Sequence, residues 1–279
     1  MGIFVNHVHV FPEWLRPDGT IDQFRAVMDA CGIDRASLWA PFSHRWAQGA
    51  AADQEPGAHN RWLAREVQHH PEFVGFGTVD PAEGAPLAAE QVREIAELGL
   101  RGIKLHPAAQ RFRIDSPWVI QVCRAAANHR LLVDWHTGTH QHSLADSHPL
   151  LLDRVAEAVP DVTMVFEHVG GWSFYRDVVA VIQNHPPGAS DGAAPGRLYA
   201  GITSVLDRNR REWYLGAAGL DELRWQLGEA LLIYGTDFPY NRTEQITADI
   251  ELIQGLSWPE EAKAAVLGGN LVRLLSTLR

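Results

Sequence analysis

Short apolar, β-branched segments alternate along the chain with longer segments whose apolar positions recur at helical spacing. Thr20, Ser116 and Ser147 stand at or just before the start of such helical segments, where short polar side chains cap the backbone. The longer segments predict helices at residues 21–31, 61–70, 86–98, 117–129 and 150–159. The short segments predict eight strands, at residues 3–10, 35–41, 73–80, 100–106, 131–137, 162–168, 198–203 and 231–236.

Strict alternation of strands and helices predicts parallel strands joined by right-handed crossovers. A closed barrel and an open doubly wound sheet both fit this order. Histidines and acidic residues stand at the C-terminal ends of several strands along the whole chain, and a barrel gathers all such ends on one face. We therefore expect a (β/α)8 TIM barrel, formed by residues 1–279 as one domain, with an extra C-terminal helical segment at 259–278.

Composition narrows the class of protein. The hydrophobic fraction of 46% and the charged fraction of 21% are ordinary for a globular domain, and no apolar run reaches the roughly 18 residues of a spanning helix. The N-terminus lacks the basic segment of a signal peptide, and Cys31 and Cys123 are the two cysteines, so we expect a cytoplasmic protein. A net charge of −10 disfavours nucleic acid as a partner. We expect a small-molecule substrate and no membrane partner, and a homodimer remains an open alternative.

The first predicted strand carries an H-x-H pair, His7 and His9. Residues two apart in a strand share a face, so the two imidazoles can hold one cation while Val8 and Val10 face the helices. The same alternation places Asn6 on the face away from the pair. An isolated H-x-H pair also occurs by chance, so this motif alone does not decide the matter.

Three further residues stand where other predicted strands end. His136 ends the fifth strand in VDWHTG, His168 ends the sixth in MVFEHVGG, and Asp237 follows the eighth in LIYGTDFPY. Taken alone, each of these residues is interpreted equally well as a metal ligand or as a hydrogen-bonded residue at the mouth of the barrel. Together with His7 and His9 they offer the nitrogen and oxygen donors that zinc and similar divalent metals prefer.

Six motifs are spread over nearly the whole chain: VNHVHVF, RGIKLHPAAQRF, LLVDWHTGT, MVFEHVGG, LIYGTDFPY and LGGNLVRLL. In these motifs the sequence resembles the amidohydrolase superfamily, in the amidohydrolase-related branch that includes aminocarboxymuconate-semialdehyde decarboxylase. The resemblance implies that His7, His9, His136 and Asp237 bind one divalent metal, most simply Zn²⁺ with Mn²⁺ as the alternative, and that His168 transfers protons. The family's first motif usually carries Asp where this chain has Asn6, and we expect little consequence from this difference because Asn6 is expected to face away from the histidine pair.

A divalent cation lowers the pKa of bound water toward about 7, so Asp237 is expected to act as a base and His168 to orient water or polarise the substrate. In a two-metal site His168 would instead be a ligand. Lys104 and His106 share one face of the fourth strand and are expected inside the barrel. Lys104 can be a carboxylated bridge between two metals or an unmodified lysine that supports ligands or substrate; we expect the second role and a single metal.

Substrate contacts are expected from the loops that follow the strands. Arginines there suit a carboxylate, because the guanidinium fork matches that anion. The predicted function is a metal-dependent hydrolase of a small carboxylated amide, ester or lactone, and a metal-dependent decarboxylase or other lyase is the alternative. The candidates for substrate binding are Lys104, His106, Arg111, Arg113, His140, Trp172 and Arg242, with Arg45 and Trp46 in the loop after the second strand.

Overall fold

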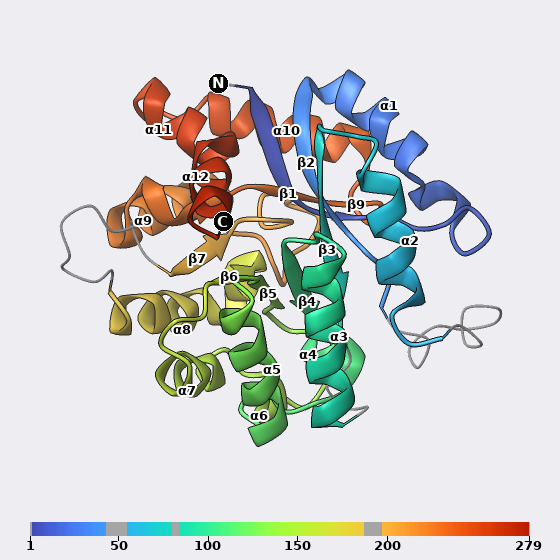
Figure 1. Ribbon diagram of the computed structural model, residues 1–279. Helices are drawn as coiled ribbons and strands as arrows, with labels where there is room; N and C mark the ends of the chain where they lie inside the picture. The colour runs from blue at the N-terminus through green and yellow to red at the C-terminus, as the bar shows by residue number, and fades with distance from the viewer. Residues whose placement is uncertain (1, 43–54, 80–83, 187–196, 279) are drawn as a thin grey trace.

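The computed structural model describes residues 2–42, 55–79, 84–186 and 197–278. Its strands lie in one parallel sheet in the order β8-β7-β6-β5-β4-β3-β2-β1-β9, surrounded by helices (Figure 1). The predicted barrel is confirmed. The strands are β1 (Ile3–His9), β2 (Ile33–Trp39), β3 (Phe73–Thr78), β4 (Gly102–Leu105), β5 (Leu132–His136), β6 (Met164–Glu167), β7 (Leu198–Gly201), β8 (Leu232–Ile233) and β9 (Gly235–Phe238).

The eighth predicted strand is divided at Tyr234. Its first half, β8, pairs with β7, and its second half, β9, pairs with β1. The two edge strands of the sheet are therefore consecutive in the chain, and this brings the barrel nearly to closure. The division arises because the Tyr234 N–H donates to the Val266 carbonyl of the C-terminal segment, at 3.2 Å, instead of to a neighbouring strand.

The helices follow the predicted periodicity and pack around the strands. Thr20 caps the first helix by accepting a hydrogen bond from the Gln23 N–H, and the helix ends at Gly32, whose φ of 66° suits a residue without Cβ. In the described residues no helix has the length and apolarity needed to cross a membrane. The α-helices are α1 (Ile21–Cys31), α2 (Ala58–Val67), α3 (Ala85–Glu97), α4 (Pro107–Gln110), α5 (Pro117–Asn128), α6 (Leu144–Ser147), α7 (Leu151–Ala158), α8 (Gly171–Asn184), α9 (Gly216–Leu227), α10 (Thr243–Gln254), α11 (Glu260–Ala264) and α12 (Asn270–Thr277).

The C-terminal segment packs against the start of β1. A wide turn, Ala265–Gly269, joins α11 to α12, and a Cβ added to Gly268 would lie 2.7 Å from the Phe4 backbone nitrogen. A glycine is required there because backbone meets backbone. The expected extra helices therefore close the N-terminal end of the barrel, away from the strand ends that carry the histidines.

A bulge in β1 changes the expected alternation of its side chains. From Val5 to Val8, β1 advances three residues while the paired stretch of β2 advances two. The extra residue is accommodated at His7, whose φ is 57°. As a result Asn6, His7 and His9 all project into the barrel. The expectation that Asn6 faces away from the histidine pair is wrong, because a regular two-residue period does not hold across a bulge.

Candidate metal centre

A cavity of about 740 Å³ opens at the C-terminal ends of the strands, where barrel enzymes place their active sites. Strands β1, β4, β5, β6 and β9, or the residues that follow them, contribute its histidines and the carboxylate of Asp237. Of the residues selected from the sequence, those that line it are His7, His9, Lys104, His106, His136, His140, His168 and Asp237.

Three donor atoms of His7, His9 and Asp237 converge at the bottom of this cavity. The two Nε2 atoms are 3.2 Å apart, and Asp237 Oδ1 lies 3.4 Å from His7 Nε2 and 3.6 Å from His9 Nε2. Donors bound at about 2.0–2.1 Å around a tetrahedral zinc ion are roughly 3.4 Å from one another. The three donors therefore fit one divalent cation, and they form a candidate metal site.

Unusual backbone conformations place these side chains. His7, His168 and Asp237 have φ values of 57°, 63° and 56°, in the left-handed region that residues other than glycine seldom occupy. Each stands where its strand ends or bulges, so the local twist turns the side chain toward the barrel axis. Such conformations cost of order 1–3 kcal/mol each and concentrate at functional sites.

Asp237 is fixed as an ionised carboxylate. Ser204 Oγ donates to Asp237 Oδ2 at 3.0 Å, and Asn241 Nδ2 donates to Ser204 Oγ at 2.9 Å, which leaves Asp237 Oδ1 directed at the histidine pair. Burial opposes ionisation of Asp237, but the nearby imidazoles, His7 first, hold its pKa well below the usual value. The carboxylate is thus available as a ligand or as a base.

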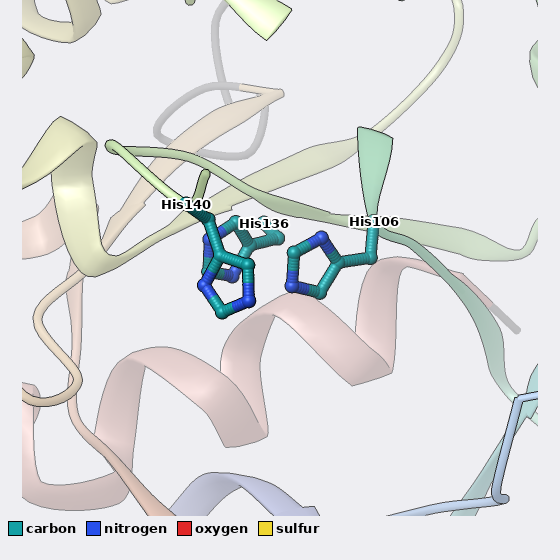
Figure 2. Close-up of side chains that lie close together, drawn as sticks. All are labelled: His106, His136 and His140. Carbon is teal, nitrogen blue, oxygen red and sulfur yellow. The ribbon is translucent and has the colours of Figure 1, made fainter. Parts of the chain in front are cut away.

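His136 lies beside the converging donors without sharing their arrangement. Its ring centroid is 4.7 Å from that of His168, and its Nε2 is buried with no hydrogen-bond partner among the described residues. A buried nitrogen without a partner is costly, and a metal ion would satisfy it. One ring nitrogen of His136 lies within 4.8 Å of ring nitrogens of His106 and His140, and Figure 2 shows the three side chains close together. A fourth-ligand role for His136 stays a prediction.

His168 presents a free lone pair to the cavity. Its Nδ1 lies 3.0 Å from the Thr203 carbonyl oxygen, which can only accept, so the neutral ring carries its proton on Nδ1 and a lone pair on Nε2. Burial, together with the positive charges of His7 and Lys104, lowers the pKa of His168 well below its usual value despite Asp237. Trp213 packs against the ring at a centroid distance of 4.2 Å. His168 is therefore oriented to accept a proton.

A buried charged cluster lies directly below the cavity. Lys104 Nζ is 2.5 Å from Asp134 Oδ1 and 3.4 Å from His7 Nδ1. Asn6 Nδ2 donates to Asp134 Oδ2 at 3.1 Å and to Glu167 Oε1 at 2.6 Å. Lys104 and Asn6 thus bridge two buried carboxylates beneath the cation site, and the supporting or substrate-binding role expected for Lys104 stays a prediction.

The cluster orients His7. Its Nδ1 lies 3.5 Å from Glu167 Oε1 and 3.6 Å from Asp134 Oδ1, so its Nε2 is directed at the cavity. Burial and Lys104 oppose protonation of His7, but Glu167, Asp134 and Asp237 outweigh them and raise its pKa well above the usual value. Asp134 and Glu167 were missed in the sequence, although Asp134 shares a strand face with His136 and Glu167 directly precedes His168.

The remaining sequence candidates lie elsewhere. Within the described part of the chain Arg111, Arg113, Trp172 and Arg242 are outside the cavity lining. Arg113 donates to the Ala145 carbonyl at 2.6 Å, and Trp172 is 62% exposed. Arg45 and Trp46 fall outside the described residues. The lining residues that sequence reasoning missed are Phe42, Ala109, Thr139, Gln141, Arg210, Glu212, Trp213 and Tyr240.

Several solved structures share this fold over their whole length. An uncharacterised TIM-barrel protein from Bordetella bronchiseptica has a TM-score of 0.79 and 19% identity, with 100% of this chain and 99% of that chain covered. The 5-carboxyvanillate decarboxylase of Sphingomonas paucimobilis has a TM-score of 0.72 and 17% identity, with 99% of each chain covered. A dihydroxybenzoic acid decarboxylase from a Polaromonas species, solved with manganese and the inhibitor 2-nitroresorcinol, has a TM-score of 0.71 and 16% identity, with 100% and 98% covered.

The sequence model of the amidohydrolase family matches residues 6–276, which span the chain from the first histidine motif to the final helix. This match confirms the resemblance that the strand-end motifs indicated, and the chain belongs to the amidohydrolase family.

Proposed function

We propose that this protein is a metal-dependent decarboxylase of a small aromatic or unsaturated carboxylic acid. The observation that carries the proposal is the convergence of His7, His9 and Asp237 donor atoms at the bottom of a cavity walled by Trp213 and Tyr240. Two of the three structures compared above are decarboxylases, and this supports decarboxylation better than the hydrolysis expected first.

His7, His9 and Asp237 would hold the cation, with His136 as the fourth ligand. A divalent cation supplies a Lewis acid that binds and polarises anionic substrate oxygens. Manganese in the Polaromonas decarboxylase makes Mn²⁺ the first ion to test, alongside the zinc expected from the ligand types.

Loss of carbon dioxide requires one proton at the carbon that loses it. The carbon–carbon bond breaks, its electron pair stays on the substrate carbon, and a proton replaces the departing group. Asp237 is ionised and His168 is neutral, and both face the cavity, so each can take up a proton and return it to that carbon. Trp213 holds the His168 ring in place for this transfer.

The cavity also indicates the size and charge of the substrate. Its volume of about 740 Å³ suits a single small organic molecule. Arg210 lines it, and its Nη2 donates to the Tyr240 carbonyl at 3.0 Å, which ties together the loops after β7 and β9. In this proposal Arg210 binds the carboxylate of the substrate, which is the role that the sequence predicted for other loop arginines.

Hydrolysis is the second candidate, and the ionised state of Asp237 favours it, because a carboxylate beside a cation site can take a proton from water. The two reactions are separated by assaying Mn²⁺- and Zn²⁺-loaded enzyme with hydroxybenzoates, unsaturated diacids, esters and lactones in oxygen-18-labelled water. Release of carbon dioxide without label in the organic product is expected. Label in the product without carbon dioxide would establish hydrolysis instead.

A further inference from the structure

His106 stands at the end of β4 and is held by a set of hydrogen bonds in the sequence HPAAQ. The His106 N–H donates to Gln110 Oε1 at 2.7 Å, and the Gln110 N–H donates to the His106 carbonyl at 2.8 Å. Gln110 Nε2 donates in turn to the Val79 carbonyl at 2.5 Å, which fixes this turn to the end of β3. Gln110 is completely buried.

The imidazole of His106 is fixed as well. The Ala109 backbone N–H, which can only donate, lies 3.2 Å from His106 Nδ1. Nδ1 must therefore carry the lone pair, and the neutral ring has its proton on Nε2. This is the opposite tautomer to that of His168, whose Nδ1 donates to the Thr203 carbonyl.

A ring nitrogen of His106 lies within 4.8 Å of one nitrogen each of His136 and His140. The tautomer of His106 nevertheless argues against a role as a metal ligand. Coordination through Nε2 would move the proton to Nδ1, where it would oppose the Ala109 N–H. The rings of His106 and His136 are also stacked, with centroids 3.7 Å apart and planes 9° apart (Figure 2). Lone pairs of two parallel rings lie in separate planes and do not meet at one ion.

We propose that His106 is a substrate-binding residue whose Nε2–H donates a hydrogen bond to an anionic oxygen of the substrate, and that Gln110 is its positioning residue. The substrate would thus be bound between an imidazole donor on β4 and the cation site of β1 and β9. The inference rests on the proposed function for the location of the substrate, but the tautomer and the donor role are tested without turnover.

Two substitutions test the roles of the two ring nitrogens of His106 separately. In His106→Asn the amide oxygen can still accept from the Ala109 N–H, but the donor at Nε2 is lost. In His106→Gln the longer amide reaches the Nε2 position and keeps a donor, but the acceptor for Ala109 is lost. His148→Asn is the matched control, because His148 Nδ1 also accepts a backbone N–H, that of Leu150, and lies outside the cavity lining in the described residues.

The tautomer is measured by long-range proton–nitrogen NMR of zinc-loaded protein with nitrogen-15-labelled histidine. The His106 signals, assigned by their loss in His106→Asn, should show an unprotonated Nδ1 and a protonated Nε2. Gln110→Leu should shift them toward a mixture of tautomers. A protonated Nδ1 in the wild type, or loss of a metal equivalent in His106→Asn, would overturn the proposal.

The donor role is measured by titrating benzoate, salicylate and 2-nitroresorcinol into metal-loaded protein. His106→Asn should weaken their binding roughly 10- to 100-fold, as expected for losing a hydrogen bond to a charged group, while His106→Gln and His148→Asn stay near the wild type. Unchanged binding in His106→Asn, or no binding to the wild type, would contradict the donor role. If the anions bind as expected but no acid releases carbon dioxide, the proposed reaction fails and this binding role stands.

Discussion

The Nε2 atoms of His7 and His9 lie 3.2 Å apart, and the bulge of β1 between Val5 and Val8 allows Asn6 to project into the barrel beside both histidines. The positions of the candidate metal ligands His7 and His9 and of their neighbour Asn6 therefore depend on one local distortion of one strand. Substitutions of Asn6 and of the metal-site histidines therefore both test the conformation of the bulged part of β1.

Two substitutions of Asn6 should destabilise the fold to different extents, with Asp more destabilising than Ala. Asn6→Ala removes the donor to Asp134 and Glu167, and we expect a loss of about 1–3 kcal/mol in the free energy of unfolding. Asn6→Asp adds a third carboxylate to this buried pair, and we expect a larger loss, about 3–5 kcal/mol. Urea unfolding of both variants measures this. Wild-type stability in Asn6→Asp would mean that the side chain does not face the cluster.

Asp249 on α10 should make stability depend on pH. Burial raises its pKa from the ordinary 3.8 to about 7, so the folded state disfavours its ionised form. The folded-state pKa lies above the unfolded one, and the wild type therefore loses stability as pH rises from about 4 to about 7. Asp249→Asn lacks this loss. Its advantage over the wild type should grow by about 2 kcal/mol between about pH 5.5 and about pH 8, at 1.36 kcal/mol per pKa unit.

Thermal or urea unfolding of both proteins at the two pH values measures this advantage, and Asn at 249 can still accept the hydrogen bond from Gln245 Nε2. A constant difference between the two proteins across this range would show that Asp249 does not titrate there.

Asp237→Asn should separate catalysis from metal binding. The amide oxygen can still face the histidine pair, but the ionised group that takes up a proton is lost. We expect the turnover number to fall about 1,000-fold and metal affinity to fall much less, roughly tenfold. Ser204→Ala, which removes only the donor to Asp237 Oδ2, is the milder comparison. Equal losses of turnover and metal binding in Asp237→Asn would contradict this division of roles.

Local sequence signals were sufficient for the barrel and for the strand-end histidines and Asp237 that lie at its mouth. The helix predicted at 21–31 begins where the cap at Thr20 indicates. The strand-end histidines meet in one cavity because parallel strands place their C-terminal ends on one face.

Features that depend on distant partners were not predictable in the same way. The β1 bulge requires the register with β2, and the break at Tyr234 requires the Val266 carbonyl from the last helices. The tautomer of His106 depends on the turn that follows it. Asp134 was within reach of pattern reasoning, because it alternates with His136 in the same strand.

The most direct test of the central claim is the metal content of purified protein, measured after growth with Mn²⁺ and Zn²⁺ and again after reconstitution. We predict about one equivalent in the wild type, lost in His7→Ala and in His136→Ala, and kept in His140→Ala. No bound metal after reconstitution, or a stoichiometry that is unaffected by His7→Ala, would contradict the cation site at the bottom of the cavity and the reaction proposed for it.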